Sequence, residues 1–253
     1  MHDFPSQPDS FDADGLPLPG PETKAGFKPR LGTRVLLVFL IIIWPGVGLT
    51  LLLFGETSLD LDRLDPVLFI FLPTIILQWL IFLAVALGVF REQSSFSSIG
   101  LVRPRPVDLP RAVAFLLVSN VILTGLQWLL SLVGLTVSAE VGDLVRKAGS
   151  SIGWWLALSI TAGVCEEAAF RGYIMTRIKG LFPGTGWALP VLLSSLSFAA
   201  GHSYQGVAGL ILLFVYGLMF CGLFLYTKSL WPGILAHFIQ DFSAIFIFQY
   251  MDF

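Results

Sequence analysis

The stretch SIGWWLALSITAGVCEEAAFRGY, residues 151–173, decides the class of fold. Its first part, as far as Cys165, is almost entirely apolar, and two glutamates and an arginine follow within a few residues. The apolar part predicts a membrane-spanning helix, which needs about 20 residues to cross the hydrocarbon core. An ionised side chain at the centre of a bilayer costs roughly 2.5–3.5 kcal/mol even on the mildest scale. Glu166, Glu167 and Arg171 therefore indicate a functional site inside a membrane protein.

The composition of the whole chain is also that of a membrane protein. Hydrophobic residues make up 55% of its 253 residues and charged residues only 13%, where soluble domains carry about 25% charged residues. The mean hydropathy is +0.82. No basic face with interleaved aromatic residues is present, so a nucleic-acid partner is not expected. Cys165 and Cys221 lie in apolar segments without CxxC spacing, which gives no indication of a disulfide framework or a thiolate zinc site.

The apolar runs predict an all-α membrane protein, a polytopic bundle of about seven transmembrane helices with a disordered N-terminal tail. The tail is residues 1–30, which are rich in Pro, Gly, Asp and Ser and contain no apolar run. The transmembrane helical domain is residues 31–253. Its expected spans are Val35–Phe54, Pro66–Phe90, Ala112–Leu135, Trp154–Arg177, Trp187–His202, Gly206–Tyr226 and Pro232–Phe248.

The basic residues between the spans predict the orientation. If the N-terminus is cytoplasmic, three basic residues lie on the outer side, at Arg63, Arg146 and Lys147. Eleven then lie on the cytoplasmic side, at Lys24, Lys28, Arg30, Arg34, Arg91, Arg103, Arg105, Arg111, Arg177, Lys179 and Lys228. Because short cytoplasmic loops carry an excess of Lys and Arg, we expect a multi-pass protein with a cytoplasmic N-terminus.

The ionisable residues inside the spans are confined to the C-terminal helices. The first three spans contain none, and the last four contain Glu166, Glu167, Arg171, His202, His237 and Asp241. This segregation predicts one polar site enclosed by the C-terminal helices, with the first three spans as lipid-facing supports.

Spacing suggests a role for each group. Glu167 and Arg171 are four residues apart on one helix face and can pair. Glu166 lies about 100° around the helix, so it is left without a counter-charge and is a candidate general base. His237 and Asp241 are also four apart, and a carboxylate can hold one ring nitrogen while the other faces a substrate or metal.

The residues alone leave three classes of function open. The first is a membrane hydrolase, and the second is an ion- or proton-coupled transporter that uses the same groups as a relay. The third is a non-catalytic immunity or scaffold protein, in which the Glu–Arg pair and the histidines serve packing. The absence of an inverted repeat in the sequence counts against the transporter.

Three motifs carry a resemblance to a known family. They are EEAAFR at residues 166–171, FAAGH at 198–202 and HFIQD at 237–241. In this order they resemble the EExxxR, FxxxH and HxxxN/D motifs of the CPBP family, which contains CAAX prenyl endopeptidases and bacteriocin-processing enzymes and is also called the Abi family. The similar region is a core at about residues 95–245.

The resemblance implies an intramembrane protease of the CAAX endopeptidase type. Its substrate would be a peptide or protein within or at the membrane, in some members a lipid-modified one, and the bilayer is its other partner. By motif position, Glu166 looks like the general base and His202 lies beside it on the attacking water. His237 and Asp241 look like the oxyanion stabilisers.

The same motif positions give Glu167 and Arg171 a supporting role, in which they hold the helix and tune the base. Asp241 departs from the commoner Asn of the family, and an ionised Asp cannot donate a hydrogen bond to an oxyanion. A metalloprotease is the alternative: if a metal such as Zn²⁺ is bound, then Glu166, His202 and His237 would be its ligands. No HExxH motif is present, and we expect metal-free activation of water.

Straight spans would place the site residues at different depths. Glu166 would lie near the middle of the bilayer, with His202 and His237 towards opposite ends of their helices. A common site therefore requires that the HSYQG turn, residues 202–206, and the WPG segment, residues 231–233, both lie inside the bundle, where irregular backbone is tolerated around a water-filled cavity.

Overall fold

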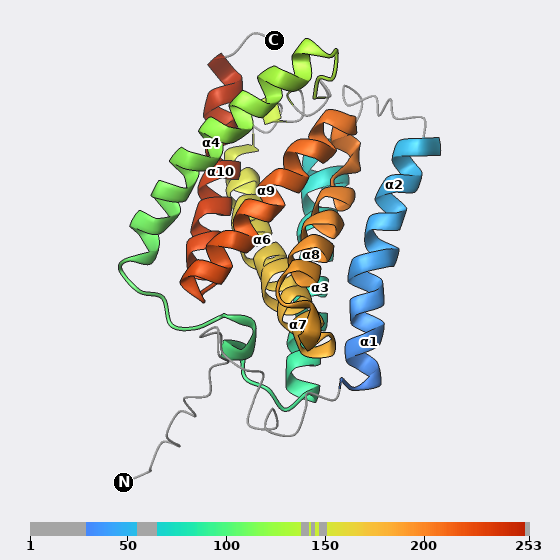
Figure 1. Cartoon of the computed structure of the whole chain (residues 1–253). Coiled ribbons are helices and arrows are strands. Elements are labelled where there is room, and N and C mark those ends of the chain that lie inside the picture. Colours follow the sequence, from blue (N-terminus) through green and yellow to red (C-terminus); the bar gives the residue numbers. More distant parts are fainter. Residues whose placement is uncertain (1–28, 55–64, 138–141, 143–144, 147–150, 251–253) are drawn as a thin grey trace.

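The structure is a computed structural model that describes residues 29–54, 65–137, 142, 145–146 and 151–250. Residues 1–28, almost all of the predicted tail, lie outside the described residues. Within the described part the chain forms seven helices and no strand, packed side by side as a bundle (Figure 1). The predicted all-α membrane fold is therefore confirmed.

Each predicted span corresponds to one helix, and several helices change winding along their length. The first consists of α1 (Leu31–Val38), the π-helical η2 (Phe39–Ile43) and α2 (Trp44–Phe54). The second consists of the π-helical η3 (Val67–Phe71) and α3 (Leu72–Arg91), and the 3₁₀ turn η4 (Phe96–Ile99) separates it from the third, α4 (Asp108–Leu132). The fourth consists of α6 (Ile152–Glu166), the π-helical η6 (Glu167–Ile174) and α7 (Met175–Leu181). The 3₁₀ turn η7 (Pro183–Thr185) precedes α8 (Ala188–Gly201), and η8 (Ser203–Gln205), α9 (Gly206–Thr227) and α10 (Trp231–Tyr250) complete the chain.

Four helical segments of the described chain are long and apolar enough to cross a membrane, namely Leu31–Thr50, Val67–Arg91, Asp108–Leu132 and Ser203–Thr227. Their outer faces expose large apolar side chains, as on α4 with Leu117, Val121, Trp128 and Leu132. An exposed apolar face of this length suits contact with lipid. Of the other three segments, α8 is a shorter apolar helix, and the remaining two carry most of the candidate site residues.

Two prolines within the predicted spans follow a π-helical segment. Segment η2 ends two residues before Pro45, and η3 ends two residues before Pro73. Proline has no N–H to donate, and its ring crowds the preceding turn of the helix. The wider turn of a π-helix before the proline makes room for the ring. Pro190 lies in the first turn of α8, where a missing N–H costs nothing.

The fourth helix runs through the middle of the bundle (Figure 1), where it contacts α3 and α10. Two glycines allow α10 to approach it closely. A Cβ atom at Gly163 would lie 2.9 Å from the carbonyl oxygen of Ile234, and one at Gly233 would lie 2.9 Å from Oε2 of Glu167. Glycine is therefore required at position 163 if α10 is to lie against α6, and a side chain at position 233 would displace the carboxylate of Glu167.

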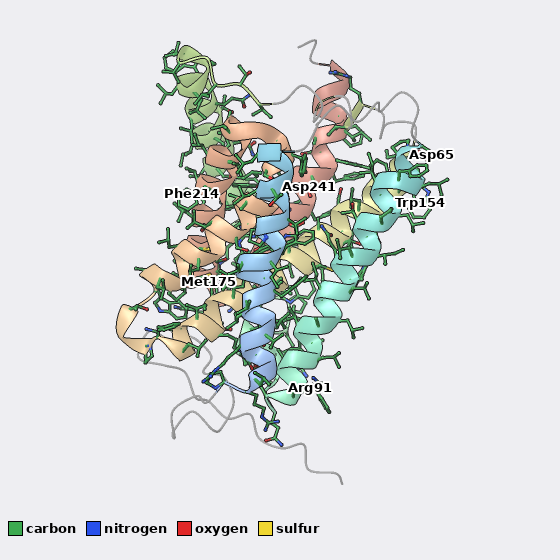
Figure 2. The ribbon with its side chains drawn as sticks, turned by 90° about the vertical axis from the view of Figure 1, so that its right-hand side faces the viewer. Asp65, Arg91, Trp154, Met175, Phe214 and Asp241 are labelled. Atoms are coloured by element: carbon green, nitrogen blue, oxygen red, sulfur yellow. The ribbon has the colours of Figure 1, made fainter. Side chains whose placement is uncertain are left out.

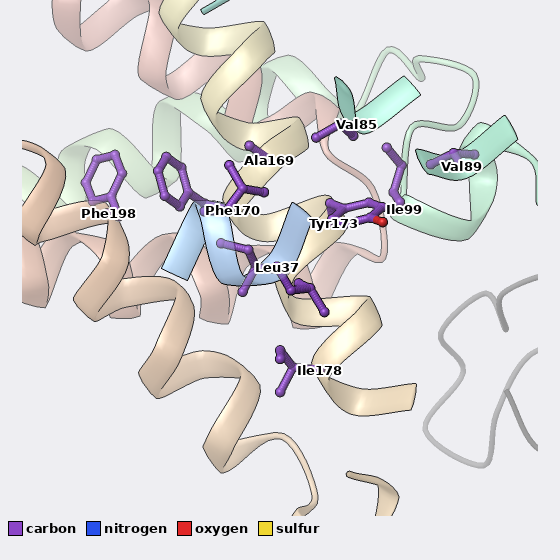
Figure 3. Close-up of a cluster of buried hydrophobic side chains, with 11 residues drawn as sticks. Leu37, Val85, Val89, Ile99, Ala169, Phe170, Tyr173, Ile178 and Phe198 are labelled. Atoms are coloured by element: carbon purple, nitrogen blue, oxygen red, sulfur yellow. The ribbon is translucent and has the colours of Figure 1, made fainter. Parts of the chain in front are cut away.

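The π-helical segment η6 is held on one side by a cluster of buried apolar side chains (Figure 3). Ala169, Phe170 and Tyr173 of η6 pack there against side chains of the first two helices, of η4 and of α8, which include Leu37, Val85, Val89, Ile99 and Phe198. This packing fixes the backbone from which the two glutamates project.

A cluster of polar side chains is buried where α7 meets the end of α3. We call it the Arg177 cluster, and it consists of Thr33, Glu92, Ser98, Tyr173 and Arg177. Arg177 Nε donates to Glu92 Oε2 at 2.8 Å, and its Nη2 donates to Ser98 Oγ at 2.9 Å. Oε1 of Glu92 accepts from Thr33 and Tyr173 at 2.7 and 2.9 Å. The sequence places Arg177 among the cytoplasmic loop charges, whereas the structure buries it completely. Arg177 therefore takes part in an internal ion pair, although the prediction from the sequence counts it with the basic residues of the cytoplasmic loops.

Candidate active site

The structure brings all of the predicted site residues together. They come from α6 and η6, from the end of α8 and from α10, and we call them the site cluster: Glu166, Glu167, Arg171, His202, His237 and Asp241. Along the bundle, Figure 2 shows Asp241 between Arg91 and Asp65 and nearer to the Asp65 end. The side chains of Arg171, Glu167 and His237 are buried. The cluster therefore forms within the bundle, as the segregation of ionisable residues predicts.

The centre of the cluster is one oxygen of Glu166 that faces two imidazole rings. Glu166 Oε2 lies 3.8 Å from His202 Nε2 and 4.0 Å from His237 Nε2. It is buried and has no hydrogen-bond partner among the described residues. Both distances exceed hydrogen-bond length. The three atoms therefore lie near one another without direct hydrogen bonds between them, an arrangement that a bridging water would satisfy.

The inner side of the cluster is a row of three groups. Arg171 Nη1 donates to Glu167 Oε1 at 2.9 Å, the pair that the four-residue spacing predicts. The same oxygen lies 3.1 Å from His237 Nδ1. A carboxylate accepts only, so Nδ1 of His237 carries the hydrogen. Glu167 thus connects the buried arginine to the ring of His237.

This contact changes the role that the sequence suggests for Asp241. We expected Asp241 to hold one nitrogen of His237 and leave the other free, but Glu167 holds Nδ1. Asp241 Oδ2 lies 3.5 Å from Nε2, the nitrogen that also faces Glu166. Asp241 therefore lies on the same side of the ring as Glu166, where it would itself face a bound substrate.

His202 is oriented by the backbone of its own helix. Its Nδ1 lies 2.8 Å from the carbonyl oxygen of Phe198. Because a carbonyl can only accept, Nδ1 carries the hydrogen and a neutral ring presents the lone pair of Nε2 towards Glu166. Both histidines are thus held at Nδ1 and turn Nε2 to the same carboxylate.

Arg171 is completely buried but has few polar partners. Its guanidinium carbon lies 4.3 Å from the ring centre of Phe198 and 4.7 Å from that of Phe220. Nε and Nη2 have no hydrogen-bond partner among the described residues. The aromatic residue of the FAAGH motif therefore stabilises the cation through its ring face, a function that the motif alone does not reveal.

One residue at the site was missed in the sequence. Gln78, in α3, donates from Nε2 to Glu166 Oε1 at 2.7 Å. We expected the first three spans to serve as lipid-facing supports, because they contain no ionisable residue. The signal that could have identified Gln78 is an amide inside an apolar span, since such groups form hydrogen bonds between membrane helices.

Exposure rises across the cluster from the inside outwards. The side chains of Arg171 and Glu167 are 0% and 1% exposed, that of Glu166 is 12%, and that of Asp241 is 36% exposed. From the sequence we expect the HSYQG turn and the WPG segment to lie inside the bundle, and this is found only in part. Pro232 and Gly233 of the WPG segment are buried, whereas Tyr204 of the HSYQG turn is exposed. A substrate would therefore approach from the side of Asp241 and His202.

The spacing of the side chains in the site cluster does not suit a metal ion. Within the described residues no group of three or more His, Cys, Asp or Glu side chains is arranged to hold a metal ion. Nε2 of each histidine lies about 4 Å from Oε2 of Glu166. Two ligand atoms on a tetrahedral zinc, each at about 2.0–2.2 Å from the ion, would lie closer together. The side chains in these positions do not fit zinc.

Comparison with known proteins gives one family match, to the C-terminal part of the chain. No curated protein and no solved structure was found that matches the chain. Residues 148–243 match the family model described as type II CAAX prenyl endopeptidase Rce1-like, a range that includes every residue of the site cluster. The family supports an endopeptidase, and with the apolar helices it indicates an integral membrane protein. Residues 148–243 are therefore similar to the Rce1-like type II CAAX prenyl endopeptidases, in agreement with the resemblance that the three motifs carry.

Proposed function

We propose that this protein is an intramembrane endopeptidase in which Glu166 and His202 activate water to hydrolyse a peptide bond of a membrane-associated or lipid-modified peptide. One observation carries the proposal. Glu166 Oε2 is buried without a partner among the described residues and faces Nε2 of two histidines. Buried polar atoms are normally satisfied, so this oxygen is suited to receive a proton from a water bound between it and the two histidines.

In the first step the water oxygen attacks the peptide carbonyl carbon. Glu166 Oε2 takes one proton from the water, and Nε2 of His202 accepts a hydrogen bond that orients it. The carbon becomes tetrahedral, and its oxygen becomes an oxyanion.

In the second step the C–N bond breaks. The electron pair of the oxyanion re-forms the carbonyl, and the proton held by Glu166 passes to the leaving nitrogen. The products are a carboxylic acid and an amine, and Glu166 returns to its starting state.

The oxyanion would be stabilised by the pair His237 and Asp241. Since Nδ1 of His237 carries the hydrogen bonded to Glu167, Nε2 can donate only if the ring is an imidazolium. Otherwise the donor would be a protonated Asp241, whose Oδ2 lies beside the same nitrogen. In both cases one of these two groups, the His237 ring or the Asp241 carboxyl, carries an additional proton. That group would donate a hydrogen bond to the oxyanion and stabilise its developing charge.

The test is Glu166→Gln in purified protein reconstituted into liposomes. This change keeps size and polarity and removes the base, so we expect the rate of peptide cleavage to fall about 10²–10⁴-fold, the usual contribution of a general base. The same substitution at Glu92 is the matched control, since Glu92 belongs to the Arg177 cluster, and cleavage by the folded Glu92→Gln protein should continue. New peptide termini should be identified by mass spectrometry. Wild-type cleavage by Glu166→Gln would overturn the proposal, and no new termini with the wild-type protein would favour a transporter or scaffold.

A further inference from the structure

The amide of Gln78 touches the candidate base from a helix outside the family domain. Gln78 lies in α3, whereas the matched family region begins at residue 148. The 2.7 Å contact between Gln78 Nε2 and Glu166 Oε1 is at the short end of the range for hydrogen bonds to ionised groups. It is also partly buried, where a hydrogen bond has more effect than in water.

The orientation of the amide follows from the chemistry of its partner. An ionised carboxylate can only accept, so the NH₂ group of Gln78 must face Glu166. The amide oxygen then points elsewhere, and Gln78 Oε1 is buried without a hydrogen-bond partner among the described residues. Leaving a buried acceptor unsatisfied is costly, so the arrangement is not explained by satisfaction of the glutamine itself.

The contact makes the two oxygens of Glu166 unequal. Oε1 accepts from Gln78, and Oε2 faces the two histidines without a partner. When Oε2 takes a proton, Oε1 becomes a carbonyl oxygen that can still accept from the same amide. The hydrogen bond therefore survives proton transfer and keeps the reacting oxygen turned towards His202.

We propose that Gln78 is a positioning residue for the general base, which fixes the plane of the Glu166 carboxylate and assigns proton transfer to Oε2. This inference rests on the proposed function, because it requires that Glu166 act as the base. It extends the site beyond the family domain to α3, and it gives one of the first three helices a part in the reaction.

The experiment compares Gln78→Met with the wild type in single-turnover cleavage. Methionine has similar length and flexibility but no N–H donor. We expect kcat and the single-turnover rate to fall about 10–100-fold, the usual range for a residue that orients an active group, while KM stays near the wild-type value. Gln78→Asn should show the same loss, because its shorter side chain cannot reach Glu166. The second variant keeps the test valid if the first is poorly folded.

Trp79→Phe is the matched control. Trp79 is the next residue of α3, and its Nε1 donates to Thr161 Oγ1 of α6 at 3.1 Å. The substitution removes a hydrogen bond between the same two helices without touching Glu166. We expect kcat to stay close to the wild-type value, whatever the effect on thermal stability.

Two outcomes would overturn the inference. If Gln78→Met and Gln78→Asn cleave at nearly the wild-type rate, the contact does not position the base. If Trp79→Phe loses kcat as much as they do, the loss reflects helix packing alone. Failure of the proposed function is distinguishable from both outcomes. If the Glu166→Gln protein cleaves peptides at the wild-type rate, Glu166 is not the general base, whatever the Gln78 variants do.

Discussion

Two buried arginines lie six residues apart in the central helix, and their surroundings differ. Arg177 donates from all three of its nitrogens, to Glu92, Ser98 and the neighbouring Thr176. Arg171 has one hydrogen bond, to Glu167, and two of its nitrogens have no partner among the described residues. Both side chains are fully buried.

The difference distinguishes the Arg177 cluster, which is fully hydrogen-bonded, from the candidate active site, which is not. The carboxylate of Glu92 is satisfied at both oxygens, by Arg177 at one and by Thr33 and Tyr173 at the other. Glu166 is satisfied at one oxygen only. A fully satisfied polar network rigidifies a protein, whereas an unsatisfied buried group requires an explanation. Burial and charge alone would not have distinguished the two sites.

The largest expected effect comes from the same substitution in both clusters. Glu92→Gln and Glu167→Gln each leave a buried arginine without its counter-charge, which costs about 3–5 kcal/mol of folding stability. Thermal unfolding in detergent should therefore shift downwards for both variants. The cleavage rate per folded molecule should fall only for Glu167→Gln, because that residue also holds the ring of His237.

Lys179→Met is the control for a charge removed from α7 outside either cluster. Lys179 is partly exposed and lies over the ring of Trp187, so its loss should cost only about 0.5–1 kcal/mol. Equal loss of rate in Glu92→Gln and Glu167→Gln would show that the two clusters do not differ in function.

The next effect concerns Asp241, the most exposed group of the site cluster. If its carboxyl donates to the oxyanion, Asp241→Ala should lower the cleavage rate about 10²–10³-fold, the usual cost of one oxyanion donor. Asp241→Asn should remain active, since an amide always has a donor. Steady-state rates in liposomes measure both.

A uniform loss of rate in Asp241→Asn across the pH range would instead indicate that the carboxylate acts as an acceptor beside His237. An alanine variant within a few-fold of the wild type would exclude Asp241 as the donor. It would leave His237, or a backbone amide, to stabilise the oxyanion.

The smallest effect is expected from removal of metal. Dialysis against a strong chelator should leave most of the cleavage activity, because Glu166 and His202 would activate water without an ion. Complete loss that is restored by stoichiometric zinc would contradict this expectation. Glu166, His202 and His237 would then be the ligands, and their spacing would have to contract on binding.

Much of the fold follows from local sequence, because apolar runs of membrane length reveal helices directly. The grouping of the ionisable residues also predicts that the C-terminal helices enclose one site. What could not be predicted depends on tertiary neighbours. Gln78 is uncharged and lies far from the motifs in sequence. Arg177 has the sequence position of a loop residue, and only the folded structure shows that Glu92 lies beside it.

The link between Glu167 and His237 escaped prediction for the same reason. Spacing within α10 suggested Asp241 as the partner of the ring, but spacing says nothing about a carboxylate on another helix. The close approach that brings Glu167 to His237 depends on Gly163 and Gly233, whose importance appears only when the helices are packed.

The π-helical winding of η6 determines how far α7 is rotated about the helix axis relative to α6. An α-helix turns by about 100° for each residue, so a different winding over the eight residues of η6 rotates α7 about its axis relative to α6. A loss of that winding would carry Arg177 away from Glu92 while Glu166 stayed against Gln78. The alignment of the anchoring end with the reacting end is therefore held by the backbone. A change of chain length between Glu167 and Ile174 should therefore separate Arg177 from Glu92 even when every side chain of the site cluster is kept.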